Sequence, residues 1–229
     1  YAWFTTETLG GGPPVYNWTW LDGLAFQDHY SYQAKARAGD QSGKTNNTSF
    51  VTFYYDITRP TSSVNVPANG SFIGALPQLG GTAADPAPNE SGVSGVQIAL
   101  RRSDNKWWDG NDWTALHAAP PDESDWLATN CVPGSCALPW TKTAGLPGPV
   151  KMSAGDYSVY SRAYDVAVNT QTSLSPAVVF TWDVAGPAVA LSTPNAAAPK
   201  VYSSMNLIGG TAQDANNTAG LEYLIKKYD

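Results

Sequence analysis

A long internal repeat constrains the fold of this chain more than any other feature. The sequence GGTAAD at 80–85 returns as GGTAQD at 209–214, 129 positions later (209 − 80). Three more segments recur in the same order with offsets of 125 or 127 positions: ARAGD at 36–40 with SRAYD at 161–165, VTFYYDITRP at 51–60 with VVFTWDVAGP at 178–187, and GVQIALRR at 95–102 with GLEYLIKK at 220–227. Chance can supply one such match but not an ordered series, so the chain is a tandem repeat.

The repeated segments have the alternating pattern of β-strands. Val96, Ile98 and Leu100 alternate with other residues, which places the three on one face of a strand. The complete repeat should hold seven strands, near 62–67, 78–85, 95–103, 112–117, 137–142, 156–164 and 177–184. The 21 Gly and 17 Pro suit many turns, and no stretch has a helical period with caps, so we predict an all-β, two-sheet sandwich. In the GGTA strand, small residues should let the backbone approach its neighbours closely.

Three motifs carry a resemblance to a known family. They are Y-x-V-x-x-R-A-x-D-x-A-x-N at 157–169, F-x-x-D-x-x-x-P at 180–187 and I-x-G-T-A-x-D at 208–214. The chain resembles the immunoglobulin-like and fibronectin type III-like repeats of large prokaryotic surface and secreted proteins. This resemblance implies tandem immunoglobulin-like β-sandwiches, with Tyr32 and Tyr157 each in the role of a tyrosine corner.

The repeat register predicts three parts. Residues 1–59 form the C-terminal part of one repeat, 60–186 form a complete repeat with a Trp-rich insertion at 103–150, and 187–229 form the N-terminal part of another. A partial sandwich leaves an apolar face and an unpaired edge. We therefore expect completion by neighbouring repeats or by copies of the same chain, with 207–214 and 220–227 pairing with 30–40 and 50–56. Assembly between chains would be head to tail and would form an open filament.

Two cysteines, Cys131 and Cys136, enclose four residues that include Pro133 and Gly134. Such a segment can turn the chain enough to close a small disulfide ring. Free buried thiols and a metal pair are the alternatives, and the metal pair has only His29 and His117 to draw on. A disulfide indicates an extracellular or cell-surface location.

The insertion contains a cluster of tryptophans with two interpretations. Exposed and coplanar rings of Trp107, Trp108 and Trp113 would form a platform for sugar rings. Alternatively, an insertion on a small sandwich needs its own apolar filling, and Trp supplies the most area per residue. The segment WWDGNDW at 107–113 also predicts a hairpin that turns at residues 109–111.

Acidic residues and glycosylation sequons form two further sets of candidates. Asp40, Asp56 and Asp85 follow predicted strands near the first repeat junction, and Asp165, Asp183 and Asp214 do so near the second. Each trio could hold one Ca²⁺, or its members could cap local turns. Asn-x-Ser/Thr sequons occur at Asn17, Asn46, Asn47, Asn69, Asn89 and Asn216. They indicate either a glycosylated surface or simply turns that are rich in Asn, Ser and Thr.

The remaining features narrow the class of function. A net charge of −6 and a pI near 4.8 argue against nucleic acid as a partner. No apolar run approaches the length of a membrane span, and no nucleophile–base set, metal cluster, cofactor motif or phosphate loop is present. An Asp pair for glycoside hydrolysis stays open, because the separation of such a pair is spatial. We therefore expect a non-catalytic structural or adhesive segment of an extracellular prokaryotic protein: a stalk, an adhesin or a fibre. The alternative is a carbohydrate-binding accessory region of a large secreted hydrolase, with glycans as partners.

Overall fold

The computed structural model describes residues 3, 8–12, 15–19, 23–86, 91–174, 178–194, 201–216 and 220–227, and the fold is all-β as expected. The chain divides into two compact units, Tyr1–Thr58 with Ala87–Ser91, and Arg59–Pro86 with Gly92–Asp229. The first unit holds β1 (Thr8–Gly12), β2 (Val15–Thr19), β3 (Tyr30–Ala34), β4 (Arg37–Gly39), β5 (Thr45–Asn47) and β6 (Val51–Tyr55). The second unit holds β7 (Thr61–Val66), β8 (Phe72–Ile73), β9 (Leu79–Ala84), β10 (Val93–Arg102), β11 (Lys106–Trp108), β12 (Trp113–Leu116), the 3₁₀-helix η1 (Glu123–Asp125), β13 (Leu127–Ala128), β14 (Trp140–Lys142), the 3₁₀-helix η2 (Pro149–Lys151), β15 (Gly155–Asp165), β16 (Val178–Trp182), β17 (Ala188–Thr193) and β18 (Gly209–Gln213).

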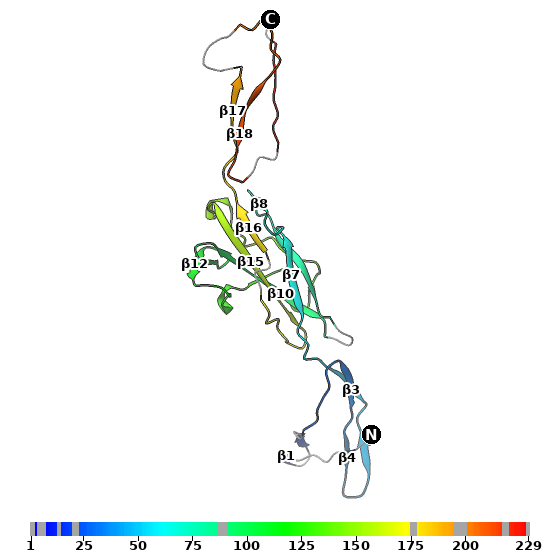
Figure 1. Cartoon of the computed structure of the whole chain (residues 1–229). Coiled ribbons are helices and arrows are strands. Elements are labelled where there is room, and N and C mark those ends of the chain that lie inside the picture. Colours follow the sequence, from blue (N-terminus) through cyan, green and yellow to red (C-terminus); the bar gives the residue numbers. More distant parts are fainter. Residues whose placement is uncertain are drawn as a thin grey trace. The chain divides into compact units, whose positions relative to one another are not determined.

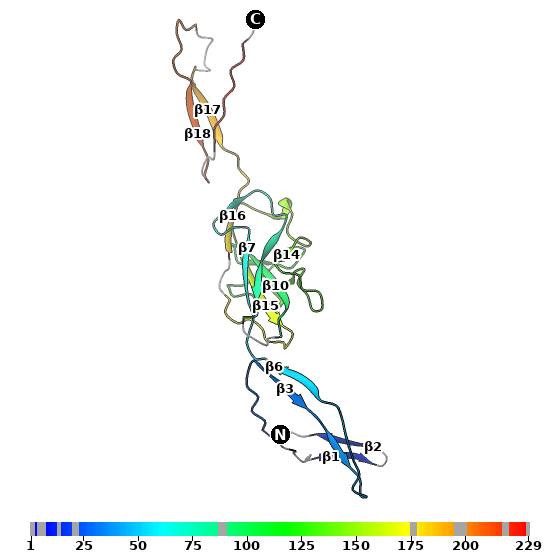
Figure 2. The same cartoon turned by 90° about the vertical axis from the view of Figure 1, so that its right-hand side faces the viewer.

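Two sheets form a sandwich from strands β7 to β16 of the second unit (Figures 1 and 2). One sheet has the order β12-β11-β10-β15-β16-β8, with β13 also pairing with β10, and the other has the order β14-β9-β7. All seven strands predicted for this repeat are present, and β11 pairs with β12 in the hairpin predicted at 107–113. The additional strands β8 and β13 are two residues long, too short to show an alternating pattern.

The main core lies between these two sheets, as the alternating pattern predicted. Val64, Leu79 and Trp140 come from the smaller sheet. They pack with Val96, Ile98, Leu100, Val159 and Phe180 of the larger sheet. On the opposite face of the larger sheet, a second buried cluster contains Ala99, Trp107, Trp126 and Tyr160. The Trp-rich insertion therefore covers the outer face of this sheet and also contributes to the main core.

Strand registers confirm the repeat at the level of single residue pairs. In β7–β9 the pairs include Thr61 with Ala84 and Val64 with Gly81. In β17–β18 the corresponding pairs are Ala188 with Gln213 and Leu191 with Gly210, displaced by 127 (188 − 61) and 129 (213 − 84) positions. Both ladders shift register at the same place, between Val64 and Val66 in one and between Leu191 and Thr193 in the other.

The same agreement relates β3–β6 to β15–β16. Tyr32 pairs with Phe53, and Tyr157 pairs with Phe180, so both partners move by the offsets seen in the sequence. Each tyrosine makes the bonds expected of a tyrosine corner. The Tyr157 hydroxyl accepts a hydrogen bond from the amide of Ser153 and donates one to its carbonyl, both at 2.9 Å. The Tyr32 hydroxyl accepts one from the Gln27 amide at 2.8 Å and donates one to the carbonyl of the same residue at 3.4 Å.

The outer repeats differ from the central one in how much apolar surface they leave exposed. In the first unit, Tyr30, Val51 and Tyr54 are 57%, 64% and 62% exposed. Residues 220–227 were predicted as a counterpart of β10, but no strand is assigned to them in the part of the chain that the structure describes. A strand needs a partner for its backbone groups, so the pattern alone did not make this segment one.

No helix among the described residues has the length and apolar character needed to cross a membrane.

Candidate functional site

The predicted disulfide is present between Cys131 and Cys136. Cys131 is fully buried, and its carbonyl accepts a hydrogen bond from the amide of Val96 in β10 at 3.0 Å. The bridge therefore closes a small ring at the point where the insertion touches the sandwich. Its role is local, because it constrains the insertion rather than linking the two sheets.

Of the two interpretations of the three candidate platform tryptophans, the structure agrees with packing, and the exposed sugar platform is wrong. Trp107, Trp108 and Trp113 are only 1%, 3% and 7% exposed. Trp107 packs on the outer sheet face, where its ring stacks on that of His117, and the other two enter the main core. A sugar ring stacks on an exposed aromatic face, and these faces are covered by protein.

Hydrogen bonds explain why these indoles can be buried. The ring N–H of Trp107 donates to the carbonyl of His117 at 3.0 Å, that of Trp108 to Gly145 at 2.7 Å, and that of Trp113 to Lys151 at 2.7 Å. Burial of an indole costs little when its single donor has a partner. The expected hairpin is confirmed, with β11 and β12 joined by residues 109–112.

The carboxylate of Asp109 holds that hairpin turn. Its Oδ1 accepts hydrogen bonds from the amides of Asp112 and Asn111 at 2.7 and 2.8 Å. These two bonds, the Asp112 amide first, hold the pKa of Asp109 below its ordinary value. The turn is therefore built on an ionised carboxylate.

The six candidate calcium ligands do not meet as two trios. Asp165 ends β15, whereas Asp183 follows β16, whose last residue pairs with Gly155 at the start of β15. An 11-residue strand spans about 33 Å, so Asp165 and Asp183 lie at opposite ends of it. Grouping them was wrong because antiparallel pairing places the ends of successive strands on opposite sides of the sheet.

The same correction applies in the first unit. Asp56 follows β6, whose last residue pairs with the start of β3, whereas Asp40 follows β4 further along the chain. Asp40 caps its own turn by accepting bonds from the amides of Ser42 and Lys44, both at 2.9 Å. The Ser42 hydroxyl bond is the main reason why the pKa of Asp40 is lowered. Asp56 accepts a bond from the amide of Thr58 at 3.0 Å.

Within the second unit, Asp85 and Asp165 come together, and Asp183 and Asp214 each bond to Asn216. Carboxylate oxygens of Asp85 and buried Asp165 lie within 4.8 Å of one another. Asp214 accepts a bond from the Asn216 amide at 2.7 Å, and a bond with the Asn216 side chain is the main cause of the lowered pKa of Asp183. Calcium at these pairs stays a prediction, tested by a rise in melting temperature with Ca²⁺ over EGTA.

The sequons fall into three environments. Asn17, Asn46 and Asn47 are exposed, as glycosylation requires, and Asn89 lies outside the described residues. Asn69 is exposed, but its side-chain carbonyl accepts a hydrogen bond from the amide of Val179 at 2.9 Å. Asn216 is half-buried beside Asp214. Glycosylation stays a prediction, most readily met at the first three positions.

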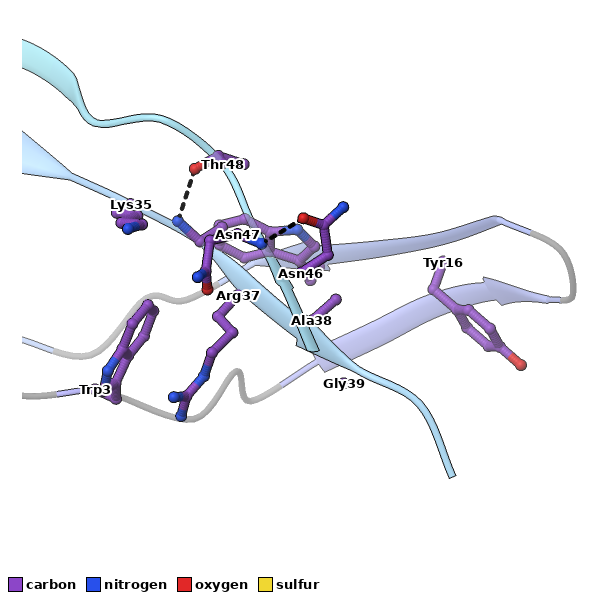
Figure 3. Close-up of a pocket in the computed structure, with 11 residues that line it drawn as sticks. Trp3, Tyr16, Lys35, Arg37, Ala38, Gly39, Asn46, Asn47 and Thr48 are labelled. Atoms are coloured by element: carbon purple, nitrogen blue, oxygen red, sulfur yellow. Dashed lines mark hydrogen bonds between the residues drawn. The ribbon is translucent and has the colours of Figure 1, made fainter. Parts of the chain in front are cut away.

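A groove in the first unit was not anticipated from the sequence (Figure 3). It encloses about 760 Å³ between β2, β4 and β5, and its walls include Trp3, Tyr16 and Trp18. These aromatic side chains are 52%, 54% and 55% exposed, and the guanidinium of Arg37 lies 4.3 Å from the ring centre of Trp3. Asn46 and Asn47 line the same groove. Half-exposed aromatic rings beside polar groups can bind a ring-shaped polar ligand.

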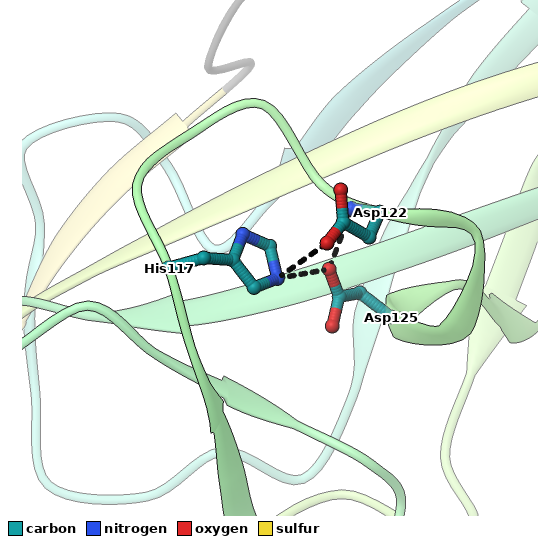
Figure 4. A group of neighbouring side chains, drawn as sticks. All are labelled: His117, Asp122 and Asp125. Carbon is teal, nitrogen blue, oxygen red and sulfur yellow. Dashed lines mark hydrogen bonds and ion pairs between the residues drawn. The ribbon is translucent and has the colours of Figure 1, made fainter.

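A group of three metal-ligating side chains was also missed (Figure 4). His117, Asp122 and Asp125 place one nitrogen and two carboxylate oxygens within 4.8 Å of one another. The sequence contains a signal for it, the spacing His-x₄-Asp-x₂-Asp, but that spacing lies across a loop and a 3₁₀-helix and matches no common metal motif.

Comparisons with known proteins add little to this description. No protein-family model matches the chain, and no curated protein matches it either. Among solved structures, the chain is similar to fibronectin(III)-like modules of Clostridium thermocellum CbhA, with 14% sequence identity and a TM-score of 0.32. The similarity covers 68% of this chain and 62% of that one, so the chain spans less than two thirds of its neighbour. The fold assignment therefore rests on the strands and registers above.

Proposed function

We propose that this chain is a non-catalytic structural or adhesive segment of an extracellular prokaryotic protein, in which tandem β-sandwiches complete one another's sheets. One observation carries the proposal. β3 pairs with β6 in the register of β15 and β16, yet within the described residues it lacks the second neighbour that β15 has in β10. The disulfide supports an extracellular location.

The missing neighbour has a candidate in the chain itself. Residues 220–227 are the sequence counterpart of 95–102 in β10; they are exposed, and among the described residues no strand is assigned to them. Leu221, Tyr223 and Ile225 correspond to Val96, Ile98 and Leu100 of the central core, and they are 63%, 77% and 68% exposed. Burial of each such side chain stabilises an assembly by about 1.5–3 kcal/mol, before the cost of association.

The central repeat also predicts the register of this pairing. Gln97 pairs with Arg162 there, and Nε of Arg162 donates a hydrogen bond to the side-chain oxygen Oε1 of Gln97 at 2.8 Å. Displaced by 125 positions, the same pair becomes Glu222 of one repeat opposite Arg37 of another. Opposite charges on directly facing residues stabilise a strand pair. Repetition of this head-to-tail contact between copies produces an open filament.

Charge reversal tests this pairing by sedimentation over a range of protein concentrations. We expect the unaltered chain to associate with rising concentration, and Arg37→Glu or Glu222→Arg to weaken association at least about tenfold, because like charges then face each other. The two changes in one chain should restore association. Lys44→Glu, with the same change of charge in the exposed β4–β5 turn, is the control and should have no effect.

Two results would refute completion between copies. One is an unaltered chain that stays monomeric at every concentration. The other is an association constant that is the same for the Arg37→Glu and Lys44→Glu variants. Loss of association in the double variant would refute the register but not the contact.

The groove of the first unit supports a second candidate function, the binding of carbohydrate. Sugar rings stack on aromatic faces and bond to amides, and the groove offers Trp3 and Trp18 with Asn46 and Asn47. Binding to a glycan array should be lost in Trp18→Ala and kept in Tyr54→Phe, since Tyr54 is exposed outside the groove. Equal binding by the two variants, or none by the unaltered chain, would refute it.

A further inference from the structure

The insertion holds a ring nitrogen toward which two carboxylates converge. His117 follows the last residue of β12, and its imidazole stacks on the ring of Trp107 with centres 5.1 Å apart. The carbonyl of the same residue accepts the indole N–H of Trp107 at 3.0 Å. These two contacts with a buried side chain fix the imidazole in position before any ligand arrives.

The other ring nitrogen of His117 decides which atom faces the carboxylates. Nδ1 lies 2.9 Å from the carbonyl oxygen of Ala118, which can only accept, so Nδ1 carries the hydrogen. In a neutral ring, Nε2 then presents a lone pair. Nε2 is sealed from solvent, with Asp125 Oδ2 at 3.0 Å and Asp122 Oδ2 at 3.4 Å. With a neutral ring, three acceptors meet at one point, and either a proton on Nε2 or a bound metal ion satisfies them together.

The 3₁₀-helix η1 and the residue before it position the two carboxylates. Asp125 is 3% exposed at the end of η1, and its Oδ2 accepts a hydrogen bond from the amide of Asp122 at 2.7 Å. Asp122 precedes η1 and reaches the site from its exposed side. One ligand is thus buried and fixed, and the other stands at the entrance.

We propose that His117, Asp122 and Asp125 bind a divalent transition-metal ion of the zinc class. Ligand atoms that each lie about 2.0 Å from a tetrahedral ion are about 3.3 Å apart, close to the two measured separations from Nε2. A nitrogen ligand suits zinc and its neighbours better than calcium, which prefers six to eight oxygens. The Nδ1–H bond to a backbone carbonyl is the usual outer contact of a metal-bound histidine. The ion would join the end of β12 to η1 and stiffen the insertion.

Zinc titration of tag-free protein at neutral pH, followed by calorimetry and by melting temperature, tests the site. We expect one Zn²⁺ per chain and a higher melting temperature, with affinity reduced about tenfold or more in Asp122→Asn and in His117→Gln. Asp122 is mostly exposed, so its variant should fold. Glu123→Gln is the matched control, because Glu123 belongs to the same 3₁₀-helix but pairs with Arg162 at 2.7 Å.

A second control addresses the only other histidine of the chain. His29→Gln should bind zinc as the unaltered chain does. Absence of saturable zinc binding would show an ion pair only and would overturn the proposal, as would equal affinity in Asp122→Asn and Glu123→Gln. The site does not depend on the proposed assembly, because it lies within one repeat.

Discussion

The tyrosine corner of the central repeat offers a sharp test of the fold, through removal of one oxygen atom in Tyr157→Phe. Tyr157 is 1% exposed, and its ring lies 5.4 Å from those of Trp113 and Phe180. Phenylalanine keeps these ring contacts. The variant loses the two 2.9 Å hydrogen bonds with the backbone of Ser153 and the hydroxyl's interaction with the Arg102 side chain.

The size of the loss follows from how well water can replace those bonds. Leaving a buried backbone amide or carbonyl without a hydrogen-bond partner costs about 1–3 kcal/mol. Ser153 is exposed, however, so water can replace part of what its amide and carbonyl lose. We therefore expect a loss of about 1–2 kcal/mol, or about 2–8 °C in melting temperature for a unit of this size. The equivalent change Tyr32→Phe should cost less, because Tyr32 is only partly buried and one of its two bonds is 3.4 Å long.

Urea unfolding followed by tryptophan fluorescence measures the effect, since Trp113 reports on the ring environment of Tyr157. Tyr54→Phe is the control, because this side chain is 62% exposed. If Tyr157→Phe cost no more than Tyr54→Phe, the hydroxyl would not anchor the strand and the reasoning would be refuted.

Three further variants test the turn, the bridge and the close strand contact. Gly81→Ala should cost about 1–3 kcal/mol in thermal unfolding, because a Cβ there would overlap a carbonyl oxygen of β7, whereas Gly148→Ala has open space and should be neutral. Cys131→Ser with Cys136→Ser should cost about 2 kcal/mol by loop entropy, and full alkylation of the unaltered chain without reductant would show that no bridge forms. The pKa of Asp109 is lower in the folded state than its ordinary value of 3.8. The stabilisation that its carboxylate gives the folded state is therefore complete above pH 3.8, and it is lost as the pH falls through the lower pKa of the folded state. Asp109→Asn should therefore flatten the acid dependence of the melting temperature, and an unchanged dependence would contradict this assignment.

Much of the central sandwich was predictable from local patterns. The alternation around Val96 and Val159 fixes which side chains enter the core, because successive residues of a strand point to opposite faces. The offsets of the repeat also predicted residue pairs, such as Tyr32 with Phe53. Short strands such as β8 were missed because two residues carry no period.

The candidate sites were less predictable, because each depends on distance in space. The sequence placed Asp165 beside Asp183, but β15 separates them by its own length. The sequence did not decide whether Trp107 is exposed or buried, because an indole suits either environment. Its burial follows from its packing on the outer face of β10 and β15. His117 has no metal motif, since its partners come from a loop and a 3₁₀-helix.

The sequence by itself determined the repeat, the strand class and the residues that face the core, because these follow from composition and from a period of two along the chain. Tertiary structure alone decided which carboxylates meet and which aromatic rings remain exposed. Such contacts join residues far apart in the sequence, and their geometry depends on strand length, on the direction of pairing and on what covers each face of a sheet.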